Sequence, residues 1–238
     1  MSHEKPIPVP ELITFDFGDT LVTSDPPYFA RIAMSLNELG FDHTHGQVEA
    51  AYHRADFRHA PRILELAPFD NDTYMRTFSE VLLQELNIPD DREKIIQELG
   101  KVLLAFRPQR VLMPGARELL KELQRRGIRL GIISNNDGRT LKKCEDVGIA
   151  GYFKFILDST LEAMMKPDPR FFRLAIDKAG VNPERALHVG DLWGSDVLGA
   201  HNAGLWAVWL KNPYLDPPAL PKAVKAERLF DILNLIKS

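Results

Sequence analysis

The spacing of apolar and polar residues divides the chain into three stretches with different periodicities. The first is a short apolar and β-branched run over residues 11–16, which ends in a carboxylate and is followed by a polar turn. Such a run is typical of a buried strand whose C-terminal end presents its last side chain. We therefore predict a strand that places Asp16 at the edge of a sheet.

The second stretch, residues 23–108, has apolar residues three or four positions apart, as on the buried face of amphipathic helices. Three groups show this spacing: Phe29, Ile32, Ala33, Leu36 and Leu39; Tyr74, Phe78, Val81, Leu82 and Leu86; Ile95, Ile96, Leu99 and Leu103. No run in this stretch is typical of a strand. We predict an all-helical segment inserted into another domain.

The third stretch, residues 109–238, alternates between the two periodicities. It predicts helices over 116–126, 139–146, 169–179, 195–202 and 227–236, and strands over 129–133, 153–157, 186–189 and 206–210, with a proline-rich loop over 213–221. Strands that alternate with helices indicate a parallel sheet covered on both faces. The predicted fold class is thus α/β: a Rossmann-like core from residues 1–22 and 109–238, with helices on both faces, and a helical cap from residues 23–108.

Composition adds little to this picture but excludes several classes of protein. The 238 residues are 45% hydrophobic and 26% charged, which is ordinary for a globular protein. A net charge of -3 gives no reason to expect a nucleic-acid partner. The single cysteine, Cys144, cannot form an intramolecular disulfide, and there is neither a signal-peptide pattern nor a bilayer-spanning apolar run. We expect a cytoplasmic protein without a membrane partner, and the sequence carries no signal for its oligomeric state.

Polar side chains follow the predicted strands at four places. These are Asp16, the pair Ser134 and Asn135, Lys166 before Pro167, and Asp191 with Asp196. Each alone is common in turns and helix caps. Ligands of open α/β sheets bind at the carboxyl ends of the strands, where these residues should meet. The set in this order therefore indicates one site.

The residue types in this set suit phosphoryl transfer. Phosphate needs a cation and hydrogen-bond donors to balance the charge that develops during transfer. Asp16 and Asp191 can hold Mg²⁺ through oxygen ligands, and Lys166 adds a positive charge. The hydroxyl of Ser134 can donate to phosphoryl oxygens. Asp16 is then able to attack phosphorus and form an aspartyl-phosphate.

The four features resemble, in order, the motifs of the haloacid dehalogenase (HAD) superfamily of hydrolases. They are Asp16 with Thr20 and Leu21, the segment Ile132 to Asn135, the Lys-Pro-Asp-Pro segment from Lys166, and Gly190-Asp191 with Asp196 five residues later. The helical segment between the first two resembles the family's type C1 cap. The resemblance covers essentially the whole chain and implies a phosphatase-like enzyme that acts on a small phosphorylated metabolite.

The resemblance also implies a role for each site residue. Asp16 is the nucleophile and a magnesium ligand. Ser134, Asn135 and Lys166 bind the phosphoryl group. Asp191, Asp196 and the backbone carbonyl of Gly18 complete the metal site.

Gly18 is the one departure from the phosphatase pattern. Most phosphatases that the chain resembles have a second Asp at this position, which acts as general acid and base. Such catalysis is worth roughly 10²–10⁴ in rate, and glycine cannot supply it. Three explanations are open. Asp19 takes over the acid/base role; or a cap residue or a water molecule supplies the proton, or the substrate is an acyl or anomeric phosphate that needs none; or the protein is a weakened or non-catalytic phosphate binder.

Two further readings rank lower. The dehalogenase branch of the family also lacks the second Asp, but it uses no magnesium and has no need of Asp191 and Asp196. A phosphate-shuttling mutase needs the acid/base residue even more than a phosphatase does.

Arg54 and Arg58 would share a helix face, where they either meet a substrate anion or form a solvated surface. Our prediction is a Mg²⁺-dependent hydrolase of small-molecule phosphate esters, with a phosphate-binding protein as the alternative.

Overall fold

A six-stranded parallel sheet forms the centre of the computed structural model, which describes residues 7–88 and 92–236. Its strand order is β5-β4-β1-β6-β7-β8, and every neighbouring pair is parallel. The strands are β1 (Leu12–Phe15), β4 (Arg129–Ser134), β5 (Phe155–Asp158), β6 (Ala186–Gly190), β7 (Trp206–Leu210) and β8 (Ala223–Ala226). Because β1 lies between β4 and β6, the connections diverge on either side of it, which is where such sheets bind ligands.

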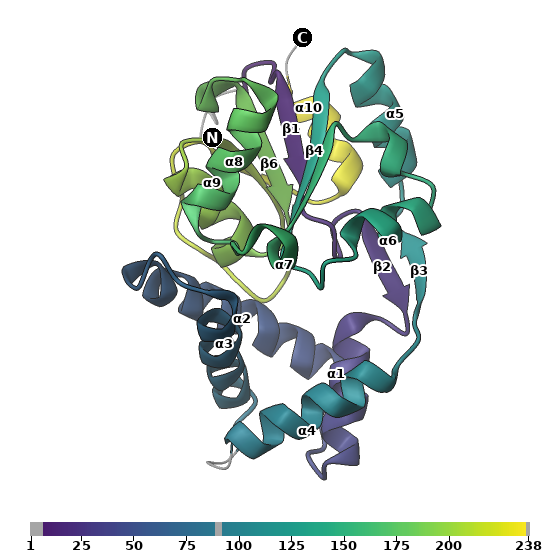
Figure 1. Cartoon of the computed structure of the whole chain (residues 1–238), viewed down its shortest axis with the longest axis vertical. Helices are drawn as coiled ribbons and strands as arrows, with labels where there is room; N and C mark the ends of the chain where they lie inside the picture. The colour runs from purple at the N-terminus through teal and green to yellow at the C-terminus, as the bar shows by residue number, and fades with distance from the viewer. Residues whose placement is uncertain (1–6, 89–91, 237–238) are drawn as a thin grey trace.

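Helices cover both faces of this sheet (Figure 1). They include α5 (Ala116–Arg125), α6 (Thr140–Asp146), α7 (Ser159–Glu162), α8 (Pro169–Ala179), α9 (Gly199–Asn202) and α10 (Ile232–Leu235). Alternate residues of β4 point to opposite faces: Ile132 packs in one apolar cluster with Leu120 of α5, and Ile133 packs in another with Phe172 of α8. The predicted α/β fold class is confirmed.

Four further helices, which we call the helical cap, lie below the sheet in Figure 1. They are α1 (Tyr28–Glu38), α2 (His45–Glu65), α3 (Asn71–Glu85) and α4 (Arg92–Ala105). Thr44 and Gln47 form a capping box at the start of α2, and Asp70 caps α3. The helices pack around their own apolar cluster, which includes Leu36 and Phe78.

A two-stranded antiparallel ribbon leads into and out of the cap. Its strands are β2 (Val22–Asp25) and β3 (Gln109–Leu112), and Val22 lies opposite Leu112. The prediction that residues 23–108 contain no strand was therefore wrong. Only Val22 of β2 is buried, so the strand has no apolar alternation of its own. It depends on pairing with β3, whose first residue lies 87 positions after the first residue of β2. The domain limits 1–22, 23–108 and 109–238 stay a prediction.

The C-terminal region also differs from expectation. The unpredicted strand β8 pairs with β7, and a 3₁₀ turn (η4, Leu229–Asp231) and the short α10 replace the helix predicted over 227–236. Upstream, the helix predicted over 195–202 begins at Trp193 as a π-helical turn (η3, Trp193–Leu198) and continues as α9. The predictions over 169–179 and 206–210 are confirmed by α8 and β7.

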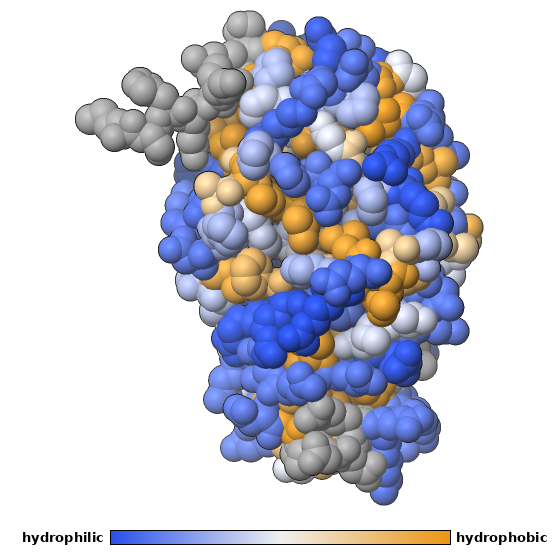
Figure 2. Space-filling view, turned by 90° about the vertical axis from the view of Figure 1, so that its left-hand side faces the viewer, coloured by the Kyte–Doolittle hydropathy of each residue, from blue (hydrophilic) through white to orange (hydrophobic). Residues whose placement is uncertain are grey.

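The outer surface is mixed in polarity. Hydrophilic atoms cover most of the lower part of the molecule in Figure 2, and hydrophobic atoms are scattered over the middle and upper parts. Among the helices of the described residues, none combines the length and the apolar character that a bilayer crossing requires.

Candidate active site

Asp16 directly follows β1, at the carboxyl edge of the sheet. Its backbone N–H donates to the carbonyl of Val189 in β6 (2.8 Å), which holds the start of the turn against the neighbouring strand. The residue is only 9% exposed. The ammonium Nζ of Lys166 lies 2.5 Å from Asp16 Oδ1, so the sheet edge brings together residues 150 positions apart.

Lys166 also contacts the fourth predicted feature. Its Nζ lies 2.6 Å from Oδ1 of Asp196, and Lys166 is 2% exposed. Asp196 has two further partners: Nε2 of His188 at 3.1 Å from Oδ1, and the backbone N–H of Leu192, which donates to Oδ2 at 3.0 Å. One buried ammonium therefore joins two carboxylates from opposite ends of the chain.

Three carboxylates form a cluster that fits a hard divalent cation. One oxygen from each of Asp16, Asp191 and Asp196 lies within 4.8 Å of the others. The hydroxyl of Thr20 donates to Asp191 Oδ1 at 3.2 Å and orients that carboxylate. Among the described residues, the ammonium of Lys166 offsets part of the negative charge of these three carboxylates. A cation that prefers oxygen ligands, such as Mg²⁺, would balance the remaining buried charge.

The pKa values in the cluster reflect this excess of negative charge. Burial raises the pKa of Asp16 to about 6, although Lys166 opposes the shift. Burial and the carboxylates of Asp196 and Asp16 hold the pKa of Asp191 well above its usual range. Burial would also raise the pKa of Asp196, but Lys166 and His188 outweigh it and lower the value to about 2. Lys166 forms ion pairs with both Asp16 and Asp196, whereas Asp191 forms none with the described residues.

Ser134 is the last residue of β4 and Asn135 directly follows it, but the two have different environments. The buried Oγ of Ser134 accepts a long hydrogen bond from Nδ2 of Asn136 (3.5 Å). The amide of Asn135 bonds the backbone of Lys166 twice, accepting from its N–H (2.8 Å) and donating to its carbonyl (2.9 Å). Asn135 therefore positions Lys166, and its direct contact with phosphate stays a prediction.

Gly18 and Asp19 form the turn after Asp16. Gly18 is exposed, and a Cβ built on it would meet no atom within 4 Å. Within the described residues, no group donates to the Gly18 carbonyl, which leaves that oxygen available to a cation. The carboxylate of Asp19 accepts from the hydroxyl of Thr23 (2.7 Å), and burial raises its pKa. Its part as a surrogate acid or base stays a prediction.

His188 and Asp56 belong to none of the four sequence motifs, and Thr20 belongs to the first motif but was given no role there. Thr20 donates to Asp191, and His188 of β6 hydrogen-bonds both Thr14 and Asp196. Asp56 comes from α2 of the cap and bonds the loop that carries Asp196. The signal for Asp56 was available: it shares a helix face with the buried Ala60 and Ile63, four and seven positions later, where a carboxylate requires partners.

The two cap arginines lie elsewhere. Arg54 and Arg58 both bind Glu85 of α3, with Arg54 Nε at 2.8 Å from its carboxylate, and both side chains are more than two-fifths exposed. They link two cap helices on the outer surface, which agrees with the solvated-face alternative.

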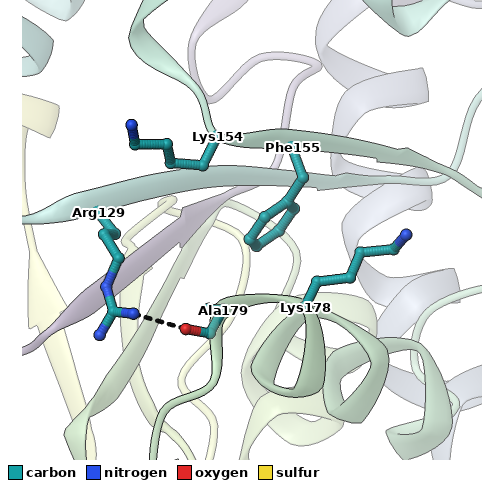
Figure 3. A pocket seen from close by; sticks show the side chains of 5 residues that line it. All are labelled: Arg129, Lys154, Phe155, Lys178 and Ala179. Atoms are coloured by element: carbon teal, nitrogen blue, oxygen red, sulfur yellow. Dashed lines mark hydrogen bonds between the residues drawn. The ribbon is translucent and has the colours of Figure 1, made fainter.

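A separate pocket of about 410 Å³ lies at the opposite end of the sheet (Figure 3). It is lined by Arg129, Lys154, Phe155, Lys178 and Ala179. Arg129 begins β4 and donates to the carbonyl of Ala179 at the end of α8 (2.5 Å) and to Glu11. The lysines are exposed, and none of the predicted site residues borders the pocket.

Comparison with known proteins shows to which family the chain belongs. The sequence pattern of the haloacid dehalogenase-like hydrolases matches residues 10–204. The chain belongs to this family. This hydrolase is 33% identical to a phosphoserine phosphatase of Thermus thermophilus over 74% of its own length and 70% of the relative's. It is 29% identical to a glyceraldehyde 3-phosphate phosphatase of Pyrococcus abyssi over 96% and 94% of the two chains.

Solved structures of the family agree on the fold. A HAD hydrolase from Bacillus subtilis, bound to magnesium, superposes on 96% of this chain and 99% of its own, with a TM-score of 0.64 at 24% identity. A 2-haloacid dehalogenase from Pseudomonas syringae covers 95% and 98% of the two chains, with a TM-score of 0.56 at 25% identity. Because hydrolases of different chemistry share this fold, the side chains of the site must distinguish between them.

Proposed function

We propose that this hydrolase is a Mg²⁺-dependent phosphatase of small phosphorylated metabolites that forms an aspartyl-phosphate on Asp16. The observation that carries the proposal is the position of Lys166 Nζ between Asp16 and Asp196, within a carboxylate cluster completed by Asp191. A buried nucleophile, a buried cation and spare carboxylates at one sheet edge are the groups that phosphoryl transfer uses. Asp16, Asp191, Asp196 and the Gly18 carbonyl would hold Mg²⁺, which supplies charge neutralisation for the incoming phosphate.

In the first step, a carboxylate oxygen of Asp16 attacks phosphorus, and the bond from phosphorus to the leaving oxygen breaks. Lys166 and the hydroxyl of Ser134 bind the phosphoryl oxygens and stabilise the charge on them. Asn135 supports this step by holding the backbone of Lys166 on both sides.

In the second step, water attacks phosphorus, the bond to Asp16 breaks, and inorganic phosphate leaves. Both steps move a proton: the leaving oxygen gains one, and the water loses one. Gly18 has no side chain for either transfer. We therefore expect the enzyme to favour acyl or anomeric phosphates, whose leaving groups depart without a proton, with water, a cap residue or Asp19 taking the remaining proton.

The substrate is expected to be small because the two phosphatase relatives are named for phosphoserine and glyceraldehyde 3-phosphate. Helices of the cap cover the sheet edge, and such closure excludes water and macromolecules. We further propose a cytoplasmic location, which the lone buried Cys144 supports.

Two alternatives have a specific observation behind them. Gly18 favours a protein that binds a phosphate ligand without turning it over. Gly18 and the fold shared with a 2-haloacid dehalogenase favour dehalogenation, but that chemistry leaves Asp191 and Asp196 without a purpose.

The deciding test is turnover of an aryl phosphate and of acetyl phosphate with Mg²⁺. We expect hydrolysis that a chelator stops and that Asp16→Asn lowers by roughly 10⁴-fold or more. Asp42→Asn, which changes an exposed carboxylate in the cap, is the matched control and should keep full activity. Tight binding of a phosphorylated metabolite without turnover would support the binding protein instead. Halide release without magnesium would support the dehalogenase.

A further inference from the structure

Asp56 belongs to the cap, yet the hydrogen bonds of its side chain to other described residues go to the sheet domain. The residue is 1% exposed, and its carboxylate accepts from the backbone N–H of Gly194 (2.5 Å), the backbone N–H of Ser195 (2.9 Å) and the hydroxyl of Ser195 (2.5 Å). Three donors converge on one buried carboxylate, so each oxygen has a partner. The contact joins residues 138 and 139 positions apart.

These bonds cap the first turn of η3. The first N–H groups of any helix lack partners within the helix, and a side chain just before the helix normally accepts from them. Leu192 stands at that place and makes no side-chain cap. Asp56, which lies in α2, caps η3 in place of Leu192. Its negative charge suits the positive end of a helix.

The backbones at this contact are in close approach. A Cβ on Gly194 would come within 2.4 Å of the carbonyl oxygen of Asp56 and 2.5 Å of the Cβ of Ala60. A second cap helix adds to the contact, because the hydroxyl of Tyr74 in α3 lies 3.2 Å from Ser195 Oγ. Since Ser195 donates to Asp56, Tyr74 donates to Ser195. The first turn of η3 is thus held by two helices of the cap.

The same turn sets the position of Asp196. Residue 196 directly follows Ser195, and its Oδ2 accepts from the N–H of Leu192, the residue before η3. Its Oδ1 meets Lys166 and His188. A rotation of the turn would therefore move one carboxylate of the cluster away from the others, and would shift the segment that starts at Asp191.

We propose that Asp56 is a positioning residue for the carboxylate cluster: from the cap, it fixes the first turn of η3 and thereby the cation-binding geometry of Asp191 and Asp196. The cap then contributes to the cation site as well as enclosing the substrate. The inference rests on the proposed function for its activity readout, but not for its structural one.

The test compares Asp56→Ala and Asp56→Asn with the parent in the full chain. Hydrogen exchange is measured without metal in peptides that span residues 191–198. Calorimetry gives the Mg²⁺ affinity, and steady-state kinetics with an aryl phosphate gives kcat and KM. We expect about 10-fold faster exchange in 191–198 and a 10- to 100-fold weaker Mg²⁺ affinity, as for other residues that orient metal ligands. We also expect kcat to fall at saturating Mg²⁺ while KM changes less than threefold.

Tyr214→Phe is the matched control. It removes the bond from the Tyr214 hydroxyl to Glu49 (2.9 Å), another contact of α2 with the sheet domain that does not touch η3. Exchange in 191–198 and Mg²⁺ affinity should stay at the parent values. If Tyr214→Phe and the Asp56 variants alter both quantities equally, Asp56 serves only general docking of the cap, and the proposal is overturned.

Unchanged exchange and Mg²⁺ affinity in the Asp56 variants would overturn it as well. Asp56→Asn keeps the shape of the side chain and decides the question if Asp56→Ala does not fold. A parent protein that turns over no phosphate would refute the proposed function alone, because exchange in 191–198 reports on Asp56 without any substrate.

Discussion

At position 18 a glycine leaves open space near Asp16, the proposed nucleophile. No atom lies within 4 Å of a built Cβ, and the backbone is outside the left-handed region that would strain other residues. A side chain can therefore enter the site here without a clash. The acid/base group that we propose the site lacks concerns this one residue, and the surrounding structure leaves room for such a group.

We predict that Gly18→Asp raises kcat for an alkyl phosphate by about 10²-fold, within the range typical of general acid–base catalysis. Gly18→Asn has the same shape without the acid and should give no increase. Steady-state kinetics on alkyl and acyl phosphates checks this, and the gain should be much smaller for the acyl phosphate. An equal gain for Asp and Asn would show that the added side chain acts by packing alone.

His59 of the cap is held neutral by its surroundings. Its Nε2 lies 2.7 Å from the hydroxyl of Thr77, and its buried Nδ1 has no partner within the described structure. Burial, helped by the nearby Arg62, lowers the pKa of His59 to about 4. A proton on Nδ1 would therefore enter an apolar pocket without an acceptor.

This arrangement predicts acid sensitivity with a definite sign. Between pH 6.5 and 4 the unfolded imidazole binds a proton that the folded one does not, so acidification favours unfolding. The free energy of unfolding should fall more steeply in the parent than in His59→Gln, by at most about 1.4 kcal/mol per pH unit. Urea unfolding at several pH values measures the difference. Above pH 7.5 the difference between the proteins should be constant, and parallel curves down to pH 4 would contradict the prediction.

At the scale of elements, the loop after β4 holds the loop before α8. The two hydrogen bonds between the Asn135 amide and the backbone of Lys166 are the link. Because Lys166 Nζ contacts two carboxylates, a small displacement of its backbone changes both contacts.

We predict that Asn135→Ala lowers kcat by about 10²-fold, the cost typical of a misplacement near 1 Å. Asn37→Ala is the matched control, because Asn37 makes the same pair of side-chain bonds to the backbone of His43 in the outer part of the cap. Its kcat should stay within twofold of the parent value. Equal losses in both variants would mean that general destabilisation explains the effect.

Elements also differ in how far their own residues predict them. The helix over 169–179 has a proline at its first position, an Asp168 cap and a glycine end, and all these signals are local. Strands β2 and β8 have four residues each and few buried side chains. Their formation depends on β3 and β7, which the sequence does not place beside them.

At the scale of the whole molecule, folding concentrates negative charge at one place. Asp16, Asp191 and Asp196 come from two distant segments, and among the described residues Lys166 is the cationic side chain that forms ion pairs with Asp16 and Asp196. A cation that binds this cluster in the folded state alone must stabilise the fold.

We predict that Mg²⁺ at 100 times its dissociation constant stabilises the protein by about 2.7 kcal/mol, which raises Tm by roughly 5–10 °C for a chain of this size. Asp191→Asn should have a much smaller response, and Asp72→Asn, at an exposed position of α3, should respond like the parent. Thermal melts at a series of Mg²⁺ concentrations check this. A Tm that does not change up to 20 mM would contradict a magnesium site in the cluster.

The fold class, the order of most core elements and the clustering of Asp16, Asp191 and Asp196 could all be predicted from the sequence. This was possible because strand and helix periodicities are local, and because parallel strands bring their carboxyl ends to one edge. Gly18 drew attention from the sequence too, because most phosphatases that the chain resembles are expected to have a second Asp at that position.

The residues that support that edge become visible once the chain is folded. Asn135 proved to hold Lys166, and Thr20 and His188 proved to orient Asp191 and Asp196. Asp56 reaches η3 across 138 residues, from a helix with no motif of its own. Such contacts depend on how the cap lies on the sheet, and spacing along the chain carries no information about a distance that folding alone makes short.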